Sequence, residues 1–237
     1  MSYTKRESKR KFDEMRKIEA KVGIVPSADG SAMFRIGDTV AVAVVRGPRE
    51  LHPKFLQNPE KGLLRCHYDM ISFSVPDRKR PGPSRRSNEI SLVTTKSLLP
   101  VLDLKQFPNS AVDVFIQITQ ANAGTRCAGI CAASMALAHA GIPMRDLISA
   151  ISVGKVGDKV LIDLDKYEED HKEGATDIPV AMDSNYNVTL LQLDGDISKD
   201  ELFESLELAK KGCKEIDELQ GKTLRDFYGV KKWIIII

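Results

Sequence analysis

The apolar residues of the chain follow two periods, one typical of strands and one typical of helices. Runs rich in β-branched residues, bounded by glycine, proline, serine and aspartate, indicate strands. They predict strands over 18–25, 31–36, 39–45, 63–74, 111–119, 147–156, 159–164, 178–182 and 188–193. We expect the third of these strands to stop at Gly47-Pro48, because both residues favour turns.

Three segments carry the three-to-four spacing of helices. The first begins near Ser87 or Asn88, and the second, rich in small residues, covers 126–140. The third begins after Ser198, where Glu201 three residues later completes a capping box, and it extends to about residue 228. Its apolar stripe predicts a buried face formed by Leu202, Leu206, Ala209, Cys213 and Ile216.

This alternation of strands and helices predicts an α/β (α+β) fold in which helices pack on mixed sheets. No segment is rich enough in linker residues to divide the chain, so we expect one domain over 1–237. It would carry a basic arm at 1–17 and an apolar tail at 233–237. Such a tail either forms an edge strand covered by a partner or packs against its own core.

Composition narrows the class of protein. The 237 residues include 35 Lys+Arg and 33 Asp+Glu, and 42% are hydrophobic. This balance argues against a uniformly basic nucleic-acid coat and against an acidic disordered protein. We expect no signal peptide and no membrane span, because the N-terminus is highly charged and the apolar runs are short. Four cysteines without a CxxC pair favour a reducing, cytoplasmic location.

Charge is unevenly placed along the chain. Basic residues gather in 5–17 and in the proline-rich segment 77–86, and acidic residues gather in 163–173. Each run alone is typical of a solvated surface. Together, a basic and an acidic loop on one domain also suit a polyanion and a divalent cation.

The strongest local signal for chemistry is a strand, a glycine turn and then a helix that begins at Gly124, Thr125 and Arg126. A helix N-terminus concentrates partial positive charge and free N–H groups, and arginine adds a planar fork suited to phosphate oxygens. Arg85 and Arg86 precede the other mid-chain helix in the same way. An ordinary strand-to-helix connection and a charged surface remain the alternatives.

Acidic chemistry is best placed at Asp170 and Asp177, of which the second enters a predicted strand. A carboxylate there could hold a hard cation or protonate a leaving alkoxide, although loop solvation and strand-end capping are the alternatives. The histidines form no zinc motif, and the serine-hydrolase, Walker and dinucleotide motifs are missing. We expect Cys127 and Cys131 to pack in the core.

Taken in order, several segments resemble the RNase PH family of phosphate-dependent 3′ exoribonucleases, and within it the catalytic subunits of the archaeal exosome. The matching segments are Ala-Asp-Gly-Ser-Ala (28–32), Tyr-Asp-Met (68–70), Pro-Ser-Arg-Arg (83–86), Ala-Val-Asp-Val-Phe (111–115), Gln-Ala-Asn-Ala-Gly-Thr-Arg (120–126), Ala-Gly-Ile-Pro-Met-Arg-Asp-Leu (140–147) and Ala-Thr-Asp-Ile-Pro-Val-Ala-Met (175–182). The resemblance implies an RNase PH-like fold, related to domain 2 of ribosomal protein S5.

The resemblance also implies a reaction, in which inorganic phosphate attacks the last phosphodiester of single-stranded RNA and releases a nucleoside diphosphate. The reverse reaction would add a 3′ tail. It assigns phosphate binding to Arg86, Gly124, Thr125 and Arg126, and RNA contacts to Arg85, Arg65 and His67. Asp177 would protonate the leaving 3′ oxygen or bind Mg²⁺ (or Mn²⁺), with Asp170 as its metal partner.

Members of this kind alternate with a related inactive subunit in a hexameric ring, a trimer of heterodimers, that carries RNA-binding cap proteins. The alternatives are a homohexameric bacterial-type RNase PH that trims tRNA ends and a non-catalytic RNA-binding ring subunit. Two departures from the family pattern stand out. Residues 6–13 read Arg-Glu-Ser-Lys-Arg-Lys-Phe-Asp in place of a segment with Arg-x-Asp-Gly-Arg. Asp170 and Asp177 are seven apart, where the family spacing is six.

Overall fold

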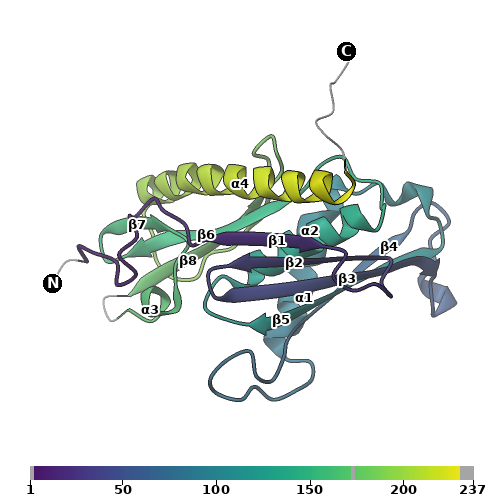
Figure 1. Cartoon of the computed structure of the whole chain (residues 1–237), viewed down its shortest axis with the longest axis horizontal. Coiled ribbons are helices and arrows are strands. Elements are labelled where there is room, and N and C mark those ends of the chain that lie inside the picture. Colours follow the sequence, from purple (N-terminus) through teal and green to yellow (C-terminus); the bar gives the residue numbers. More distant parts are fainter. Residues whose placement is uncertain (1–2, 172–173, 230–237) are drawn as a thin grey trace, which may run out of the picture.

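In the described part of the chain, two β-sheets lie end to end along the molecule (Figure 1). The computed structural model describes residues 3–171 and 174–229, so the apolar tail at 233–237 lies outside the described residues. The first sheet has the order β1-β2-β3-β5-β4 and is formed by β1 (Ile18–Val22), β2 (Gly30–Ile36), β3 (Thr39–Glu50), β4 (Leu63–Met70) and β5 (Ser110–Gln120). The second has the order β7-β6-β8-β9 and is formed by β6 (Ser149–Val156), β7 (Lys159–Ile162), β8 (Ala175–Met182) and β9 (Val188–Leu191).

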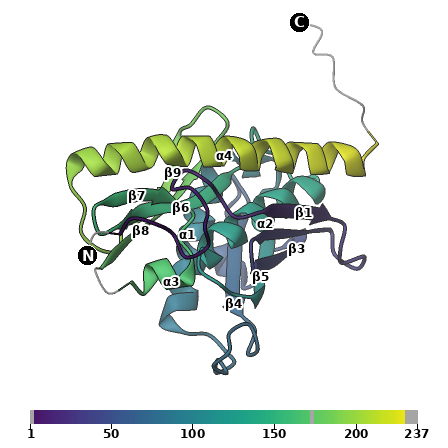
Figure 2. The ribbon, with the colours of Figure 1, turned by 60° about the vertical axis from the view of Figure 1, so that its left-hand side comes forward.

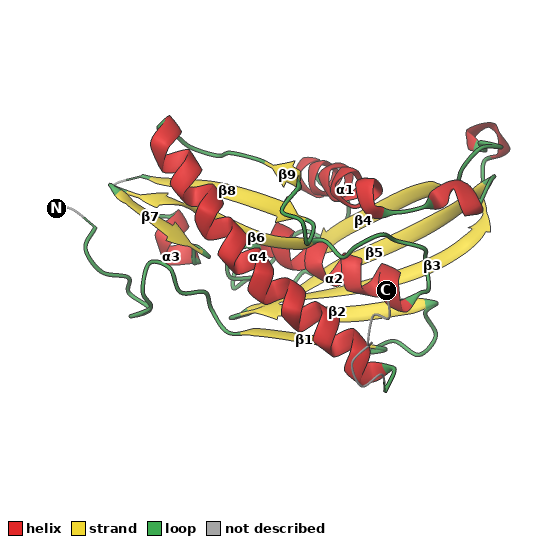
Figure 3. Ribbon diagram, turned by 90° about the horizontal axis from the view of Figure 1, so that it is seen from above, coloured by secondary structure: helices red, strands yellow, loops and turns green. Residues whose placement is uncertain are grey.

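Within 3–171 and 174–229, four α-helices cover these sheets. They are α1 (Arg85–Leu98), α2 (Thr125–His139), α3 (Lys166–Glu169) and α4 (Lys199–Phe227), and short 3₁₀ turns lie at Lys54–Leu56, Leu99–Val101 and Leu104–Gln106. α4 runs across both sheets, as Figures 1 and 3 show from the side and from above. α2 packs between the sheets and contacts strands of both (Figure 2). The predicted mixed α/β class is confirmed.

The close packing of α2 follows from its small side chains. Twelve of its residues are buried, most of them alanine, glycine, cysteine or serine, so strands can approach the helix from several sides. Gly30 of β2 meets the helix so closely that a Cβ there would lie 2.3 Å from the carbonyl oxygen of Ala136. One continuous core therefore joins the two sheets through α2.

The predicted elements are found, although the strand expected over 63–74 ends at Met70 and the one expected from 178 begins at Ala175. Three further differences have a clear local cause. β3 continues past Gly47-Pro48 to Glu50, because a shift in its pairing with β5 between Arg46 and Arg49 accommodates the two turn-forming residues. α1 begins at Arg85, since Ser84 and Ser87 cap it reciprocally. The acidic segment, expected as a loop, contains α3, which a second capping box between Asp165 and Glu168 begins.

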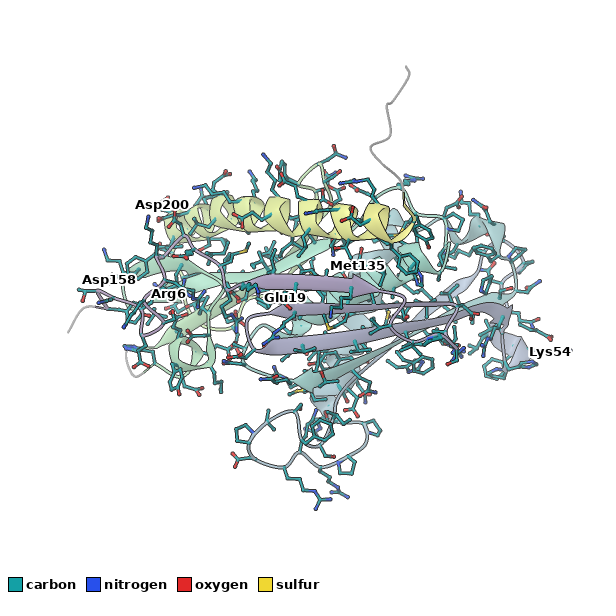
Figure 4. All side chains as sticks on the ribbon, in the orientation of Figure 1. Arg6, Glu19, Lys54, Met135, Asp158 and Asp200 are labelled. Atoms are coloured by element: carbon teal, nitrogen blue, oxygen red, sulfur yellow. The ribbon has the colours of Figure 1, made fainter. Side chains whose placement is uncertain are left out.

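Three arginines of the basic N-terminal arm pair with three carboxylates of the acidic segment. Arg6 is almost fully buried, and its Nε and Nη2 donate to the two carboxylate oxygens of Glu168 at 2.7 and 2.8 Å. Arg16 makes a second two-point contact with Asp163, and Arg10 contacts the same carboxylate at 3.2 Å. Figure 4 labels Arg6 in this region, at the opposite end of the molecule from Lys54. The charged residues engaged in this cluster bind each other, whereas the basic loop 77–86 is not part of it.

The four cysteines are buried free thiols, and Cys127 and Cys131 pack in the core as expected. None of the helices in the described ranges has the length and apolar character to cross a membrane.

Replacing Lys9 by glycine should stabilise the protein. Arg6 and Arg10 have the spacing of the two arginines in the Arg-x-Asp-Gly-Arg segment, and Lys9, at its glycine position, has φ 61°. This conformation costs an L-residue roughly 1–2 kcal/mol, and the extra unfolded-state freedom of glycine offsets roughly 0.5–1 kcal/mol of that gain. We expect Lys9→Gly to raise the melting temperature by about 2 °C. Lys11→Gly, at an exposed neighbour with ordinary φ, should lower it; a decrease for both would contradict the explanation.

Acidification should weaken the contact between α2 and the end of α4. His139 Nδ1 accepts a hydrogen bond from the backbone N–H of Ser31 at 3.0 Å, and its ring meets Phe227 edge to face. Burial lowers the pKa of His139, so the folded protein favours the neutral ring. The contribution of this ring to the free energy of unfolding is therefore complete above the pKa of an unfolded histidine, about 6.5, and is lost as the pH falls below that value. His139→Asn keeps an acceptor that cannot titrate. Melting temperatures measured from pH 7.5 to 5.5 should fall less steeply for this variant, and parallel curves would exclude the titration.

Candidate functional site

A cavity of about 450 Å³ opens where the two sheets meet beside the N-termini of two helices. Its charged lining residues come from both halves of the chain and balance in sign: Arg86, Arg126, Lys166, Glu169, Asp177 and Asp194. Gly124, Thr125, Ser152 and Gln192 also line it. Three segments expected from the sequence to carry chemistry, around Arg86, Gly124 and Asp177, thus meet in one cavity.

The turn from β5 into α2 forms one wall. Ala123 and Gly124 both adopt left-handed backbone angles, with φ 57° and 63°, which reverse the chain within two residues. Thr39 holds this turn, because its hydroxyl donates to the carbonyl oxygen of Ala123 at 2.6 Å and accepts from the N–H of Asn122 at 2.9 Å. No side chain in the described ranges caps α2, so its first N–H groups lie uncapped at the cavity.

Two arginines border this wall. Both arginines at the start of α1 are exposed, but only Arg86 lines the cavity, and Arg85 lies outside the lining. Arg126 is mostly buried, and its Nη2 donates to Glu89 Oε2 at 3.2 Å. The other oxygen of Glu89 accepts from Gln192 Nε2 at 2.7 Å.

Asp177 faces the arginines from β8. Asp177 pairs in register with Gly154 of β6. The hydroxyl of Ser152, which also lies on β6, donates to Oδ1 of Asp177. Burial raises the pKa of Asp177, while the bond from Ser152 and the charge of Arg126 act in the opposite direction. A buried carboxyl with a raised pKa beside two guanidinium groups can hold a proton or bind a cation.

The structure does not bring Asp170 into the cavity. Asp170 ends α3, its side chain is 63% exposed, and it accepts from Lys166 Nζ at 2.8 Å. Glu169, one residue earlier, lines the cavity instead. Burial, followed by the charge of Asp177, raises the pKa of Glu169 to about 7.

Arg65 and His67 also lie outside this cavity. They point away from the core on β4, where Arg65 makes a two-point contact with Asp113 at 2.6 and 2.9 Å. His67 stacks on Phe115 with 5.0 Å between ring centroids. The two residues form a separate, half-exposed group across β4 and β5.

Six polar residues around the cavity were not predicted from the sequence: Glu89, Ser152, Lys166, Glu169, Gln192 and Asp194. The Asp165-x-x-Glu168 pattern could have predicted α3, and the helix would then place Lys166 and Glu169 on one face. No sequence signal relates Glu89 to Arg126, because 37 residues separate them.

Comparisons with known proteins agree with this architecture. Models of domain 1 and domain 2 of the 3′ exoribonuclease family match residues 14–143 and 146–212. The exosome complex component Rrp41 of Pyrococcus furiosus is 50% identical over 92% of this chain and 87% of its own length. The same component of Methanopyrus kandleri is 48% identical over 93% of this chain and 92% of its own.

Two solved structures share the fold. Rice Rrp46 superposes with a TM-score of 0.81 at 23% identity, covering 92% of this chain and all of its own. The Archaeoglobus fulgidus exosome with RNA bound to the active site contains a chain that superposes with a TM-score of 0.78 at 24% identity, covering 90% and 92%. The RNase PH-like fold is thereby confirmed, and this chain belongs to the 3′ exoribonuclease family.

Proposed function

We propose that the protein is a phosphate-dependent 3′-to-5′ exoribonuclease subunit of an archaeal exosome. The observation that supports this most directly is the meeting of Arg86, the uncapped start of α2 and the buried Asp177 in one cavity. The identity of about half to archaeal Rrp41 over most of the chain supports an exosome subunit over a bacterial-type RNase PH.

In the proposed reaction, an oxygen of inorganic phosphate attacks the phosphorus of the last 3′,5′-phosphodiester. The bond from that phosphorus to the 3′ oxygen breaks, which releases a nucleoside diphosphate and an RNA shortened by one nucleotide. Two anions must approach each other, so fixed positive groups are needed that do not have to reorganise. Arg86, Arg126 and the N–H groups around Gly124 and Thr125 would bind the attacking phosphate.

The leaving 3′ oxygen needs a proton. Asp177 would supply it, because burial favours its protonated form at a higher pH than that of an exposed aspartate. Ser152 would hold the carboxyl group in place through its bond to Oδ1. The reverse reaction would use the same groups and extend an RNA 3′ end.

A Mg²⁺ or Mn²⁺ ion fits the oxygen donors at one side of the cavity. Mg²⁺ in proteins commonly takes one or two carboxylates and completes its shell with water and substrate phosphate. No cluster of three metal-binding side chains occurs within 3–171 and 174–229, so Asp177 and one further carboxylate would hold the ion. When bound, the ion would neutralise charge on the phosphate oxygens.

We further propose that the chain assembles with a related RNase PH-like subunit in a hexameric ring that bears RNA-binding cap proteins. Large exposed apolar side chains on α1, directly after it and around β9 support such a contact: Leu92, Leu99, Val188, Leu191 and Leu193. Exposed apolar groups of this kind are typical of protein interfaces. Arg85, Arg65 and His67 would then contact RNA outside the cavity.

Asp177→Asn should strongly slow turnover while leaving RNA binding intact, because the amide cannot supply the carboxyl proton. Labelled oligo(A) is incubated with Mg²⁺, with and without phosphate, using the chain alone and co-expressed with its proposed partner subunit. The unmodified protein should release nucleoside diphosphates when phosphate is present, and the variant should be slower by about 10²-fold or more.

Asp158→Asn, in the exposed turn between β6 and β7, serves as the matched control and should behave like the unmodified protein. Monophosphate products, or shortening without phosphate, would indicate hydrolysis and contradict the proposal. RNA binding without any shortening would favour the non-catalytic ring subunit. A turnover rate for Asp177→Asn close to that of the unmodified protein would reject the role of this residue as the acid.

Metal binding should distinguish the two candidate partners of Asp177. The resemblance assigned this role to Asp170, but Glu169 is the residue that lines the cavity. We therefore expect Glu169→Gln to weaken Mn²⁺ binding about tenfold, which corresponds to 1.4 kcal/mol. Electron paramagnetic resonance of Mn²⁺ measures this affinity. Asp170→Asn should change it less. The opposite order would return the role to Asp170 and require its side chain to leave Lys166.

A further inference from the structure

Glu89 lies where an anion-binding site should avoid a carboxylate. It is on α1 three residues after Arg86, which places both on neighbouring positions of the helix surface. Its Oε2 accepts from Arg126, one of the two arginines proposed to bind phosphate. A negative charge at this distance weakens the attraction of Arg126 for any anion, so the contact needs a compensating role.

The hydrogen bonds of Arg126 indicate that role. Nη2 is directed to Glu89, whereas Nε is buried and has no acceptor among the described residues. A buried, unpaired N–H is costly, and it lies on a residue that lines the cavity. A ligand oxygen would satisfy it. Glu89 thus engages one nitrogen of the guanidinium fork and leaves Nε available.

Glu89 is itself held from the other half of the fold. Gln192 donates to its second oxygen, and the backbone N–H of Gln192 donates to the carbonyl oxygen of Pro179 at 3.2 Å. Pro179 lies on β8, two residues after Asp177. A carboxylate is suited to this position because both of its oxygens accept, whereas an amide would turn a donor toward Arg126 or Gln192.

We propose that Glu89 is a positioning residue, which together with Gln192 orients Arg126 so that its Nε–H meets the attacking phosphate. This inference rests on the proposed phosphorolytic function. It links α1, α2 and the end of β9 in one hydrogen-bonded chain, so the arginine keeps a fixed distance from the strand of Asp177. The contact between Glu89 and Arg126 would lower the electrostatic attraction of Arg126 for phosphate, but it would hold the Nε–H donor in a fixed position.

Positioning and simple charge have opposite consequences. If Glu89 acted only through its charge, its removal would make the cavity more positive and lower the KM for phosphate. If it positions Arg126, its removal frees the guanidinium group and raises this KM. The direction of the change therefore separates the two explanations without reference to its size.

The test measures diphosphate release as a function of phosphate concentration in the complete complex. We expect Glu89→Gln to raise the KM for phosphate about tenfold, which corresponds to 1.4 kcal/mol, or one charge-assisted hydrogen bond. The kcat at saturating phosphate and the affinity for oligo(A) should change less than about threefold, since Arg126 reorients once phosphate is bound. Gln192→Met, which removes the donor to Glu89, should raise the same KM by a smaller factor.

Glu207→Gln is the matched control, because it removes an exposed carboxylate that pairs with Lys210 on α4, away from the cavity. The melting temperature measured at increasing phosphate concentration supplies a readout that does not depend on turnover. The phosphate concentration that gives half of the maximal rise in melting temperature should increase for Glu89→Gln and stay unchanged for Glu207→Gln. An unchanged or lower KM, with an active unmodified complex, would overturn the positioning role. An unmodified complex without phosphate-dependent release would instead refute the proposed function, and phosphate protection would still test whether Glu89 orients Arg126.

Discussion

The burial of α2 between two sheets is the constraint on which the rest of the structure depends. A helix can be enclosed on several sides only if its side chains are small, and α2 meets this condition through alanine, glycine, cysteine and serine. Its direction is then fixed by two sheets at once. Because the helix begins at their junction, its uncapped N-terminus lies beside β8 and the start of α1, and a cavity with polar donors follows from the packing.

Charge pairing supports this junction from the N-terminal side. Taking Arg6 out of water is costly, and the cost is offset because its nitrogen atoms also donate to backbone carbonyls, among them those of Ile162 and Asp163. Arg16 extends the cluster toward the cavity, since it bonds both Asp163 and the carbonyl oxygen of Asn122 in the turn before α2. The cluster thus fixes α3 and the turn before α2 relative to each other, and with them the positions of Lys166 and Gly124.

The sequence predicted elements well and side-chain partners poorly, for a physical reason. Periodicity reports which face of an element is buried, so the strands and the long helices were found close to their observed ends. Charge runs report nothing about what folds across them, and the acidic segment 163–173 was therefore interpreted without the basic arm that neutralises much of it. Asp170 shows how precisely a side-chain direction would have to be predicted. Glu169 faces the cavity, whereas Asp170, one position later on the same helical turn, contacts Lys166. Motifs could indicate Arg86, Gly124 and Asp177, but not Glu89.

The balance of charges in the cavity explains how these residues could work together. Arg86, Arg126 and Lys166 face Glu169, Asp177 and Asp194, and burial raises the pKa values of Glu169 and Asp177, so the carboxyl groups offset only part of the positive charge that attracts an anion. Selectivity must then come from donors at defined positions, where a tetrahedral anion satisfies N–H groups that water would meet less well. A site whose positive charge is partly offset also releases a charged product more easily than a site without carboxyl groups would. Fixed geometry in place of excess charge is therefore the property that the buried contacts of Arg126 and Asp177 supply.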